Sequence, residues 1–318
     1  MTNRRPSPRS PLPRRPGWMA ATLWLASCVC LLASPLAAQG VLIVNSDRSV
    51  PRYAVPHASF KDTLERPTEE IDLGSGANSE AALRRLIDSS NPSVVYCIGS
   101  QAYVSTTNVA KNRNIIVSSA LNVRRFPTSL RTFGIASELP PAAQMTVFRL
   151  LFPKVRRIGV LYSADYNGAW VREAEAQDAD VDLQVVARQV RRPGDLPGAL
   201  AALLPVVDVL WLIPDPIVLS DAKSIDLIFA EADKRSKAIF AYDAAFATRG
   251  AALAIAADVA TTGRQAARLA EDLLAGRSPT EAVQSPAGSE LTVNMRSVTK
   301  YRLELNRDAL PLVNSVIQ

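Results

Sequence analysis

Short clusters of serine, asparagine, aspartate and tyrosine recur in this sequence, each directly after an apolar run of the kind that forms buried strands. In the first half, residues 45–49, 99–102 and 118–122 follow the runs VLIVN, VVYCI and NIIV. Such side chains donate and accept hydrogen bonds with little rearrangement. In an open parallel sheet, ligands meet the carboxyl ends of the strands, because the loops there vary freely and helix starts point at the crevice. The clusters therefore predict a crevice for a small polar ligand.

Three further clusters follow apolar runs in the second half of the chain, with the sequences YSADYNG, IPDP and AYDAAF. Asp243, in the last of them, is a candidate ligand group that could hold an ammonium through a charge-assisted hydrogen bond. Tyr162, Tyr166 and Tyr242 could stack on a ligand or simply cover the surface of the fold.

Each of these positions also has an ordinary structural interpretation. Ser100 is a typical helix N-cap, and Ser118 and Ser119 could merely end a strand. The helix start after Gly99 has free backbone amides, which favour a carboxylate or another anion by about 0.3–1 kcal/mol. Asp258, before VATTGRQAA, is first of all a helix cap.

The sequence lacks the residues that several common kinds of catalysis require. His57 is the single histidine, which removes His-based triads and His-rich metal sites, and we expect it on the surface of the first helix. Neither GxxxxGK[ST] nor a GxGxxG after a strand is present, so Gly99 and Ser100 lack the neighbours that hold a pyrophosphate. No pair of acidic residues has a spacing that indicates a general acid and base. The sequence therefore predicts neither an enzyme nor a bound cofactor or metal.

Most of the net positive charge comes from the first 40 residues. These contain five arginines and no acidic residue, so the formal net charge of +6 falls to about +1 for the remainder. A nucleic-acid-binding protein usually has a basic face, and we expect no nucleic-acid partner. With 48% hydrophobic and 21% charged residues, the 318-residue chain has the composition of a globular protein.

Residues 1–40 have the pattern of an export signal, with an arginine-rich start and the apolar run GWMAATLWLASCVCLLASPLAAQG. Cleavage after Ala38 or Gly40 fits the small-residue rule. Two alternatives stay open, because Cys28 after LAS could be lipidated and the apolar run approaches the ~20 residues that span a bilayer. We expect a periplasmic protein exported through this segment, with lipid anchoring at Cys28 as the alternative. Cleavage leaves Cys97 as the single cysteine, in a buried apolar role.

Strand and helix patterns alternate along the rest of the chain. Four strand-like runs joined by helices come first, and a second series begins near Ile135. It closes with a strong helix at VATTGRQAARLAEDLLAG, a last strand at ELTVNM and a helical tail. This alternation is typical of parallel, doubly wound sheets. We therefore expect an α/β fold with two similar lobes and a short crossover near residues 131–138.

Several stretches resemble one known family. They are IGSQAYVSTTNVAKNRNIIVSSALNV, VRRIGVLYSADYNGA, RGAALAIAADVATTGRQAARLAEDLLAGRSP and ELTVNMRSV, and TGRQAARLAEDLLAG is the most specific part. From about Val41 to Leu310, the chain resembles the ABC-transporter substrate-binding proteins with the type I periplasmic-binding fold, the branch that includes tryptophan-type binders.

The resemblance implies two lobes joined by three crossovers, with a solute bound in a cleft between them. Residues 41–134 plus 257–284 would form lobe 1, and residues 135–256 plus 285–318 would form lobe 2. By position, the family's cleft loops fall on Ser46, Asp47, Ser100, Gln101, Ser118, Ser119, Tyr162, Asn167, Asp215, Tyr242 and Asp243. The segment between the first two strands is shorter than the family usually shows and contains three prolines, so we expect a short first helix and a reshaped corner of the cleft.

The resemblance makes capture of a solute the expected function. A small polar solute, amino-acid-like or related, would contact both lobes and favour their closed state by its differential affinity. An ABC permease would then receive the solute. The alternative is a sensory or accessory module that signals to a receptor or histidine kinase, and the sequence does not separate the two. We expect a monomer.

Overall fold

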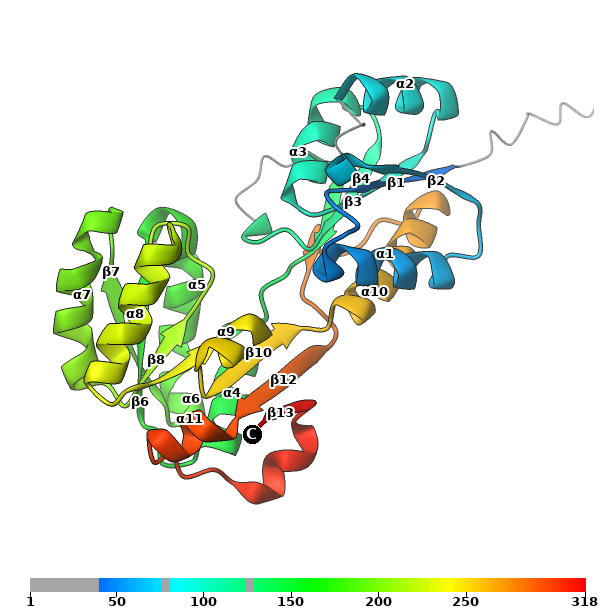
Figure 1. Ribbon diagram of the computed structural model, residues 1–318. Helices are drawn as coiled ribbons and strands as arrows, with labels where there is room; N and C mark the ends of the chain where they lie inside the picture. The colour runs from blue at the N-terminus through cyan, green and yellow to red at the C-terminus, as the bar shows by residue number, and fades with distance from the viewer. Residues whose placement is uncertain (1–39, 76–79, 124–128) are drawn as a thin grey trace, which may run out of the picture. The chain divides into compact units, whose positions relative to one another are not determined.

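The computed structural model describes residues 40–75, 80–123 and 129–318 (Figure 1). Residues 1–39 of the expected export segment, with Cys28, lie outside the described residues. The described chain contains two sheets with helices packed on both faces, which confirms the expected α/β, doubly wound fold class.

The first sheet is entirely parallel and has the strand order β11-β5-β4-β3-β1-β2. Its strands are β1 (Val41–Asn45), β2 (Thr68–Asp72), β3 (Val94–Ile98), β4 (Asn114–Ser118), β5 (Thr132–Ile135) and β11 (Val283–Gln284). The sequence predicted the first four of these. The short β5 lies in the segment that we interpreted as a crossover, and the two-residue β11 is too short to show a pattern.

Alternation along β1 explains why both faces of this sheet are buried, since successive side chains of a strand point to opposite faces. Val41 and Ile43 pack with α1 and α10, while Leu42 and Val44 pack with α2 and α3. The helices of this layer are α1 (Pro51–Thr63), α2 (Glu80–Ser90), α3 (Ser100–Val109) and α10 (Val259–Leu274), with a 3₁₀ turn η1 (Leu73–Ser75). Cys97 on β3 is fully buried, as predicted, and burial raises the pKa of its thiol to about 12.

The second sheet has the order β13-β12-β10-β9-β8-β6-β7, and only the β10–β12 pair among its described strands is antiparallel. Its strands are β6 (Arg157–Tyr162), β7 (Gln184–Gln189), β8 (Val209–Leu212), β9 (Ala238–Ala241), β10 (Leu253–Ala257), β12 (Ser289–Asn294) and β13 (Ser315–Ile317). The predicted helical tail after β12 is present but is followed by a further strand, β13, which the sequence did not reveal. That tail contains α11 and a 3₁₀ segment before β13.

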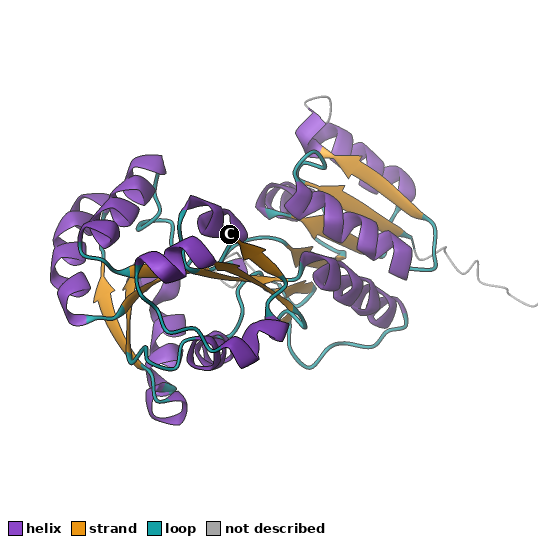
Figure 2. Cartoon of the chain, turned by 60° about the horizontal axis from the view of Figure 1, so that its bottom comes forward, coloured by secondary structure: helices purple, strands orange, loops and turns teal. Residues whose placement is uncertain are grey.

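Helices cover both faces of the second sheet as well (Figure 2). One face packs α4 (Pro141–Leu151) and α5 (Ala164–Ala176), and the other packs α7 (Leu196–Leu203) and α8 (Ala222–Lys234). The aromatic centre joins Phe148 to Trp211 and Phe240, with ring centroids 5.0 Å apart in each pair. The shorter elements are α6 (Asp178–Val181), α9 (Ala244–Arg249), α11 (Met295–Lys300), η3 (Pro193–Asp195), η4 (Leu204–Val206) and η5 (Arg307–Leu312).

The strand orders place a switch point in each sheet, where successive connections leave in opposite directions. It lies between β1 and β3 in the first sheet and between β6 and β8 in the second. The carboxyl ends of strands at such a point border a crevice. The chain crosses between the two sheets three times, from β5 to α4, from β10 to α10 and from β11 to β12. As a result, α10 packs on the first sheet and β11 pairs within it, although both follow most of the second sheet in the sequence.

The first helix is not short, contrary to the sequence-based expectation. α1 has 13 residues and begins at Pro51, where proline's fixed φ suits the first helical position. Pro56 lies inside the helix, on the face that packs against α10 (Figure 1). A Cβ at Gly263 of α10 would lie 2.4 Å from the Pro56 carbonyl oxygen, so this close helix pair requires a glycine.

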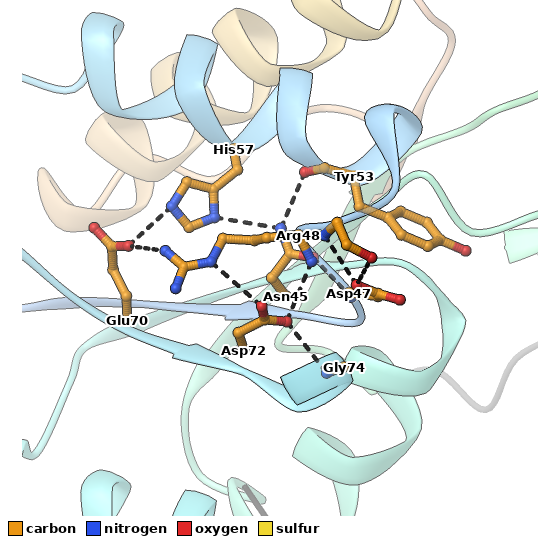
Figure 3. Close-up of polar contacts among 9 residues, drawn as sticks. Asn45, Asp47, Arg48, Tyr53, His57, Glu70, Asp72 and Gly74 are labelled. Carbon is orange, nitrogen blue, oxygen red and sulfur yellow. Dashed lines mark hydrogen bonds and ion pairs between the residues drawn. The ribbon is translucent and has the colours of Figure 1, made fainter. Parts of the chain in front are cut away.

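His57 is buried, with 6% of its surface exposed, so its prediction as a surface residue was wrong. It lies on α1 above β1 and β2 (Figure 3). Asn45 Nδ2 donates to the Tyr53 carbonyl oxygen at 3.0 Å and lies 3.3 Å from His57 Nδ1. His57 Nε2 lies 3.0 Å from Glu70 Oε2. These partners fit a neutral imidazole that accepts at Nδ1 and donates from Nε2.

Burial lowers the pKa of His57, and this effect outweighs the carboxylate of Glu70, which raises it. Arg48 and Lys61, which also pair with Glu70, lower the His57 pKa further. Burial alone would raise the pKa of Glu70, but the hydrogen bond from Lys61 and the nearby charges lower it. The cluster is therefore built for a neutral histidine beside an ionised glutamate.

We predict that the protein loses stability as the pH falls below about 6.5, the ordinary pKa of histidine. The unfolded chain takes up a proton there while the folded chain, with its lowered His57 pKa, resists it. His57→Gln should flatten the dependence of the urea midpoint on pH between 7.5 and 5.5. It should also cost about 1–3 kcal/mol at pH 7.5 for the lost buried contacts. Because His57 is the single histidine, an unchanged slope in the variant would show that the assignment is wrong.

A second prediction concerns the contact between α1 and α10. Gly263→Ala should lower the free energy of unfolding by about 1–3 kcal/mol, because the new methyl group meets the backbone of Pro56. Gly198→Ala on α7 is the matched control, since nothing lies within 4 Å of its added carbon. It should stabilise by about 0.5–1 kcal/mol through helix propensity. Equal effects of the two changes in chemical denaturation would contradict the packing argument.

Candidate functional site

The loop after β1 touches the start of α3 at the switch point of the first sheet. A Cβ at Gly99 would lie 2.4 Å from Ser46 Oγ, and Gly99 has a φ of 92°, so glycine is required on both counts. Ser46 Oγ accepts the Ala102 N–H at 3.0 Å and so caps α3 from another loop. Gly99, not Ser100, is the N-cap residue, which corrects the capping interpretation of Ser100. The Ala102 N–H at this helix start is therefore bonded to Ser46 and is not available to bind an anion.

Among the neighbouring predicted residues, the side chains of Ser118 and Asp47 make hydrogen bonds within the protein, whereas the Ser119 hydroxyl makes none. Ser118 is fully buried, and its Oγ lies 2.7 Å from the Tyr96 hydroxyl, so it supports the core. Asp47 accepts hydrogen bonds from the Ser49 hydroxyl and N–H, which lower its pKa. Ser119 differs, because its backbone is left-handed at φ 54° and its buried Oγ has no partner. Such strain, about 1–3 kcal/mol, tends to cluster at functional sites.

Asp215 holds together the switch point of the second sheet. Its Oδ2 accepts from the Ser163 N–H, the Ser163 hydroxyl and Asn167 Nδ2, each at 2.7 Å. Its Oδ1 accepts from the N–H groups of Ile217 and Val218 at 2.9 and 3.0 Å. Only 2% of Asp215 is exposed. The carboxylate thus fastens the loop after β6 to the loop after β8 and is occupied by the protein itself.

Tyr242 and Asp243 follow β9 and border a pocket. Asp243 Oδ1 accepts the Ala245 N–H at 2.9 Å and caps α9, so the candidate ligand group also has a structural role. Burial raises the pKa of the Tyr242 hydroxyl to about 12, and the carboxylates of Asp243 and Glu138 act in the same direction while Arg52 opposes them. Asp258 caps α10 as predicted, accepting from the N–H groups of Ala260 and Thr261.

The structure contains a pocket of about 310 Å³ next to the crossover from β5 to α4. This volume lies at the lower end of the range for small-molecule sites, about 300–1,000 Å³. Its lining residues come from both sheets and the crossovers: Asn122, Ala136, Ser137, Glu138, Leu139, Pro140, Pro141, Gln144, Tyr166, Asn167, Ala169, Trp170, Glu173, Ile213, Pro214, Tyr242, Ile255 and Ser285. We call it the main pocket.

A smaller pocket of about 70 Å³ adjoins it, since Ser137 and Tyr242 line both. Its other lining residues are Arg52, Ser119, Leu121, Asp243, Ala256, Ala257, Val259 and Thr262. The predicted residues Asn167, Tyr242, Ser119 and Asp243 therefore line one or both pockets. Seven other predicted residues line neither: Ser46, Asp47, Ser100, Gln101, Ser118, Tyr162 and Asp215.

Part of the polar lining was missed, because it follows a strand that the sequence did not reveal, β5, or lies on a helix. Ser137 and Glu138 lie on the crossover to α4, and Gln144 lies on α4 itself. The residues of α5 that line the main pocket are Tyr166, Asn167, Ala169, Trp170 and Glu173. Helical spacing puts Tyr166, Trp170 and Glu173 on one face, and that periodicity was readable in the sequence.

Several buried polar atoms around the pockets have no partner. Among the described residues, six buried side-chain polar atoms lack a hydrogen bond, and four of them belong to pocket-lining residues. These four are Ser119 Oγ, Ser137 Oγ, Gln144 Oε1 and Trp170 Nε1. The Gln144 amide has a defined orientation, because its Nε2 donates to the Leu139 carbonyl oxygen at 2.9 Å. Unsatisfied buried groups are rare in native proteins, which sets these four atoms apart from the rest of the described core.

One hydrogen bond links the loops of the two sheets beside the main pocket. Asn122 Nδ2, after β4, donates to the Pro214 carbonyl oxygen at 3.0 Å, and Asn167 Nδ2 donates to the same oxygen at 3.2 Å. The Asn122 N–H also donates to Glu138 Oε1.

Within the described residues, no three His, Cys, Asp or Glu side chains gather as metal ligands would. No helix there combines the length and apolarity that crossing a membrane requires.

Comparison with solved structures shows the fold. A substrate-binding protein with adhesive properties from Clostridium difficile, in its ligand-free, open structure, has a TM-score of 0.68 and 14% identity, covering 88% of this chain and 99% of that one. A protein from Streptococcus pneumonia in complex with L-Trp has a TM-score of 0.60 and 16% identity, covering 87% and 99%. A conserved domain protein from Vibrio cholerae has a TM-score of 0.59 and 18% identity, covering 88% and 99%. No curated protein matches the sequence.

The sequence also matches a family model over most of its length. The model describes ABC transporter substrate binding proteins and matches residues 71–317 of the 318. It includes α10, whose sequence is the most specific part of the resemblance, and all of the second sheet. The expected fold of the type I periplasmic-binding kind is confirmed by the strand orders together with these neighbours. The chain belongs to the ABC transporter substrate-binding protein family.

Proposed function

We propose that the protein is a periplasmic substrate-binding protein that captures a small polar, amino-acid-like solute and delivers it to an ABC permease. Family membership supports the general role. The observation that carries the specific one is the pair of adjoining pockets, around which four buried polar atoms lack partners. A bound solute would supply those partners.

The solute would bind between two lobes, one built on each sheet. We assign residues 41–134 plus 257–284 to lobe 1 and residues 135–256 plus 285–318 to lobe 2, with the crossovers between them as the hinge. The main pocket is lined by Asn122 of the first group and by Trp170 and Ile213 of the second. A ligand that contacts both groups favours whichever arrangement offers both contacts at once. A permease can then distinguish the loaded protein from the empty one.

The lining of the main pocket suits a solute with an apolar part and a few polar groups. Leu139, Ile213 and Trp170 provide apolar walls, while Gln144 and Ser137 provide polar contacts. The structural neighbour from Streptococcus pneumonia holds L-Trp, a molecule of this kind. We also propose that residues 1–40 direct export, and that the protein acts as a monomer without catalysing a reaction.

The direct test is to identify any small molecule that co-purifies with the protein, followed by calorimetry against that molecule and the common amino acids. A solute present at 100 times its Kd should raise the free energy of unfolding by about 2.7 kcal/mol. A folded protein that neither retains nor binds any such solute would contradict the proposed function.

Trp170 offers a test of the pocket itself. Trp170→Phe should weaken solute binding by about tenfold, because it removes a buried donor at the pocket wall and part of the wall. Phe60→Leu is the control, since Phe60 is a buried aromatic residue on α1 that lines neither pocket. Calorimetry with the retained solute should show a larger loss for Trp170→Phe. Equal losses in both variants would place the binding site elsewhere.

A further inference from the structure

One side chain of α10 holds the connection from β11 to β12 by three hydrogen bonds. Gln265 Nε2 donates to the Ser285 carbonyl oxygen and to Gln284 Oε1, at 3.0 Å in each case. Gln265 Oε1 accepts the Ala287 N–H at 3.1 Å. Chemistry settles the orientation of this amide, because a backbone carbonyl oxygen can only accept and a backbone N–H can only donate. Both ends of the amide therefore bind one short stretch, residues 284–287, which we call the held segment.

The held segment is also part of the pocket wall. Ser285 lines the main pocket, whereas Gln265 lines neither pocket. Ala136, another lining residue on the crossover from β5 to α4, donates its N–H to the Gln284 carbonyl oxygen at 2.9 Å. Two of the crossovers between the sheets therefore meet at this segment. Gln265 binds the backbone of the wall without being part of the lining.

Gln265 anchors the held segment to the first sheet. Its neighbour Ala266 is fully buried in the core cluster that α10 forms with that sheet. The pairing of β12 with β10 in the second sheet begins only after the held segment, at Ser289. Within the segment Pro286 has no N–H, so its backbone offers few hydrogen bonds of its own. The position of this part of the wall therefore depends on a single side chain of α10.

We infer that Gln265 is a positioning residue of the solute site, because it keeps the Ser285 wall of the main pocket in the arrangement that the solute binds. This inference rests on the proposed function and adds to it a residue that the solute does not touch. A wall that is already held costs the solute little ordering on binding. A released wall lowers the apparent affinity according to the fraction of molecules in which it lies in place.

Thermodynamic linkage gives the inference a second, independent consequence. If the hold raises the affinity for the solute, the solute must strengthen the hold by the same factor. The Ala287 N–H reports on the hold directly, since its acceptor is Gln265 Oε1. Exchange of this amide hydrogen with solvent should therefore slow when the solute binds.

The first experiment is calorimetry on the wild type and Gln265→Met with each of the common L-amino acids as probe. Methionine keeps a side chain of similar length but can form none of the three hydrogen bonds. The variant should bind the best wild-type probe about tenfold more weakly. Arg268→Met is the matched control, because Arg268 lies on the same helix, is exposed and lines neither pocket. Its affinity should equal that of the wild type.

The second experiment measures hydrogen exchange of the Ala287 amide in the wild type, with and without the same probe at saturation. Exchange should slow by about the factor that separates the two affinities. A purely structural hydrogen bond would give an exchange rate that the probe does not change. This measurement needs no variant, so it decides the question even if Gln265→Met does not fold.

The outcomes separate this inference from the proposed function. Equal affinities of Gln265→Met and the wild type, an equal loss in Arg268→Met, or unchanged Ala287 exchange would overturn the inference and leave the proposed function standing. A folded wild type that binds none of the probes would contradict the amino-acid-like solute, and this inference with it.

Discussion

The geometry of the candidate site depends on the buried carboxylate of Asp215. It accepts five hydrogen bonds from the loop after β6, the start of α5 and the loop after β8. A carboxyl group this deep in a protein is costly to bury unless its oxygen atoms accept hydrogen bonds, and here neighbouring donors supply them. The consequence is a fixed start for α5, and with it a fixed direction for the helix face that forms one wall of the main pocket.

The same anchor sets the position of the Pro214 carbonyl oxygen, which receives both Asn167 and Asn122. Asn122 lies in the loop after β4 of the first sheet, whereas Asn167 lies on α5, which packs on the second sheet. The Pro214 carbonyl oxygen therefore joins segments that belong to both halves of the fold. The Asn122 backbone in turn donates to Glu138. A short chain of polar contacts thus runs from the core of the second sheet to the acidic group of the pocket wall.

The fold could be predicted largely because its strands are buried on both faces. Five-residue runs such as VLIVN and VVYCI are apolar throughout, which is typical of parallel strands between helices. β5 and β11 escaped prediction because strands of four and two residues show no reliable pattern. The burial of His57 could not be read locally either, since it depends on Asn45 of β1 and Glu70 of β2, which the fold brings against α1.

The site was predicted less completely, for a geometric reason. The strand-end rule finds residues near a crevice, and of the predicted residues Ser119, Asn167, Tyr242 and Asp243 line the pockets. It cannot distinguish side chains that face the crevice from those, like Asp215 and Ser118, that turn inward to hold the loops. The crossover residues Ser137 and Glu138 follow β5, whose four residues did not show as a strand in the sequence, so the rule could not reach them.

The position of α10 in the chain has a consequence for how the molecule is made. Phe60 and Tyr96 pack in a cluster that is completed by Ala266, Ala270 and their neighbours on α10. During synthesis, that side of the first sheet is covered by α1 alone until residues 259–274, which form α10, have been made. Contacts so distant in sequence form slowly, and the exposed apolar surface is open to misassociation in the meantime.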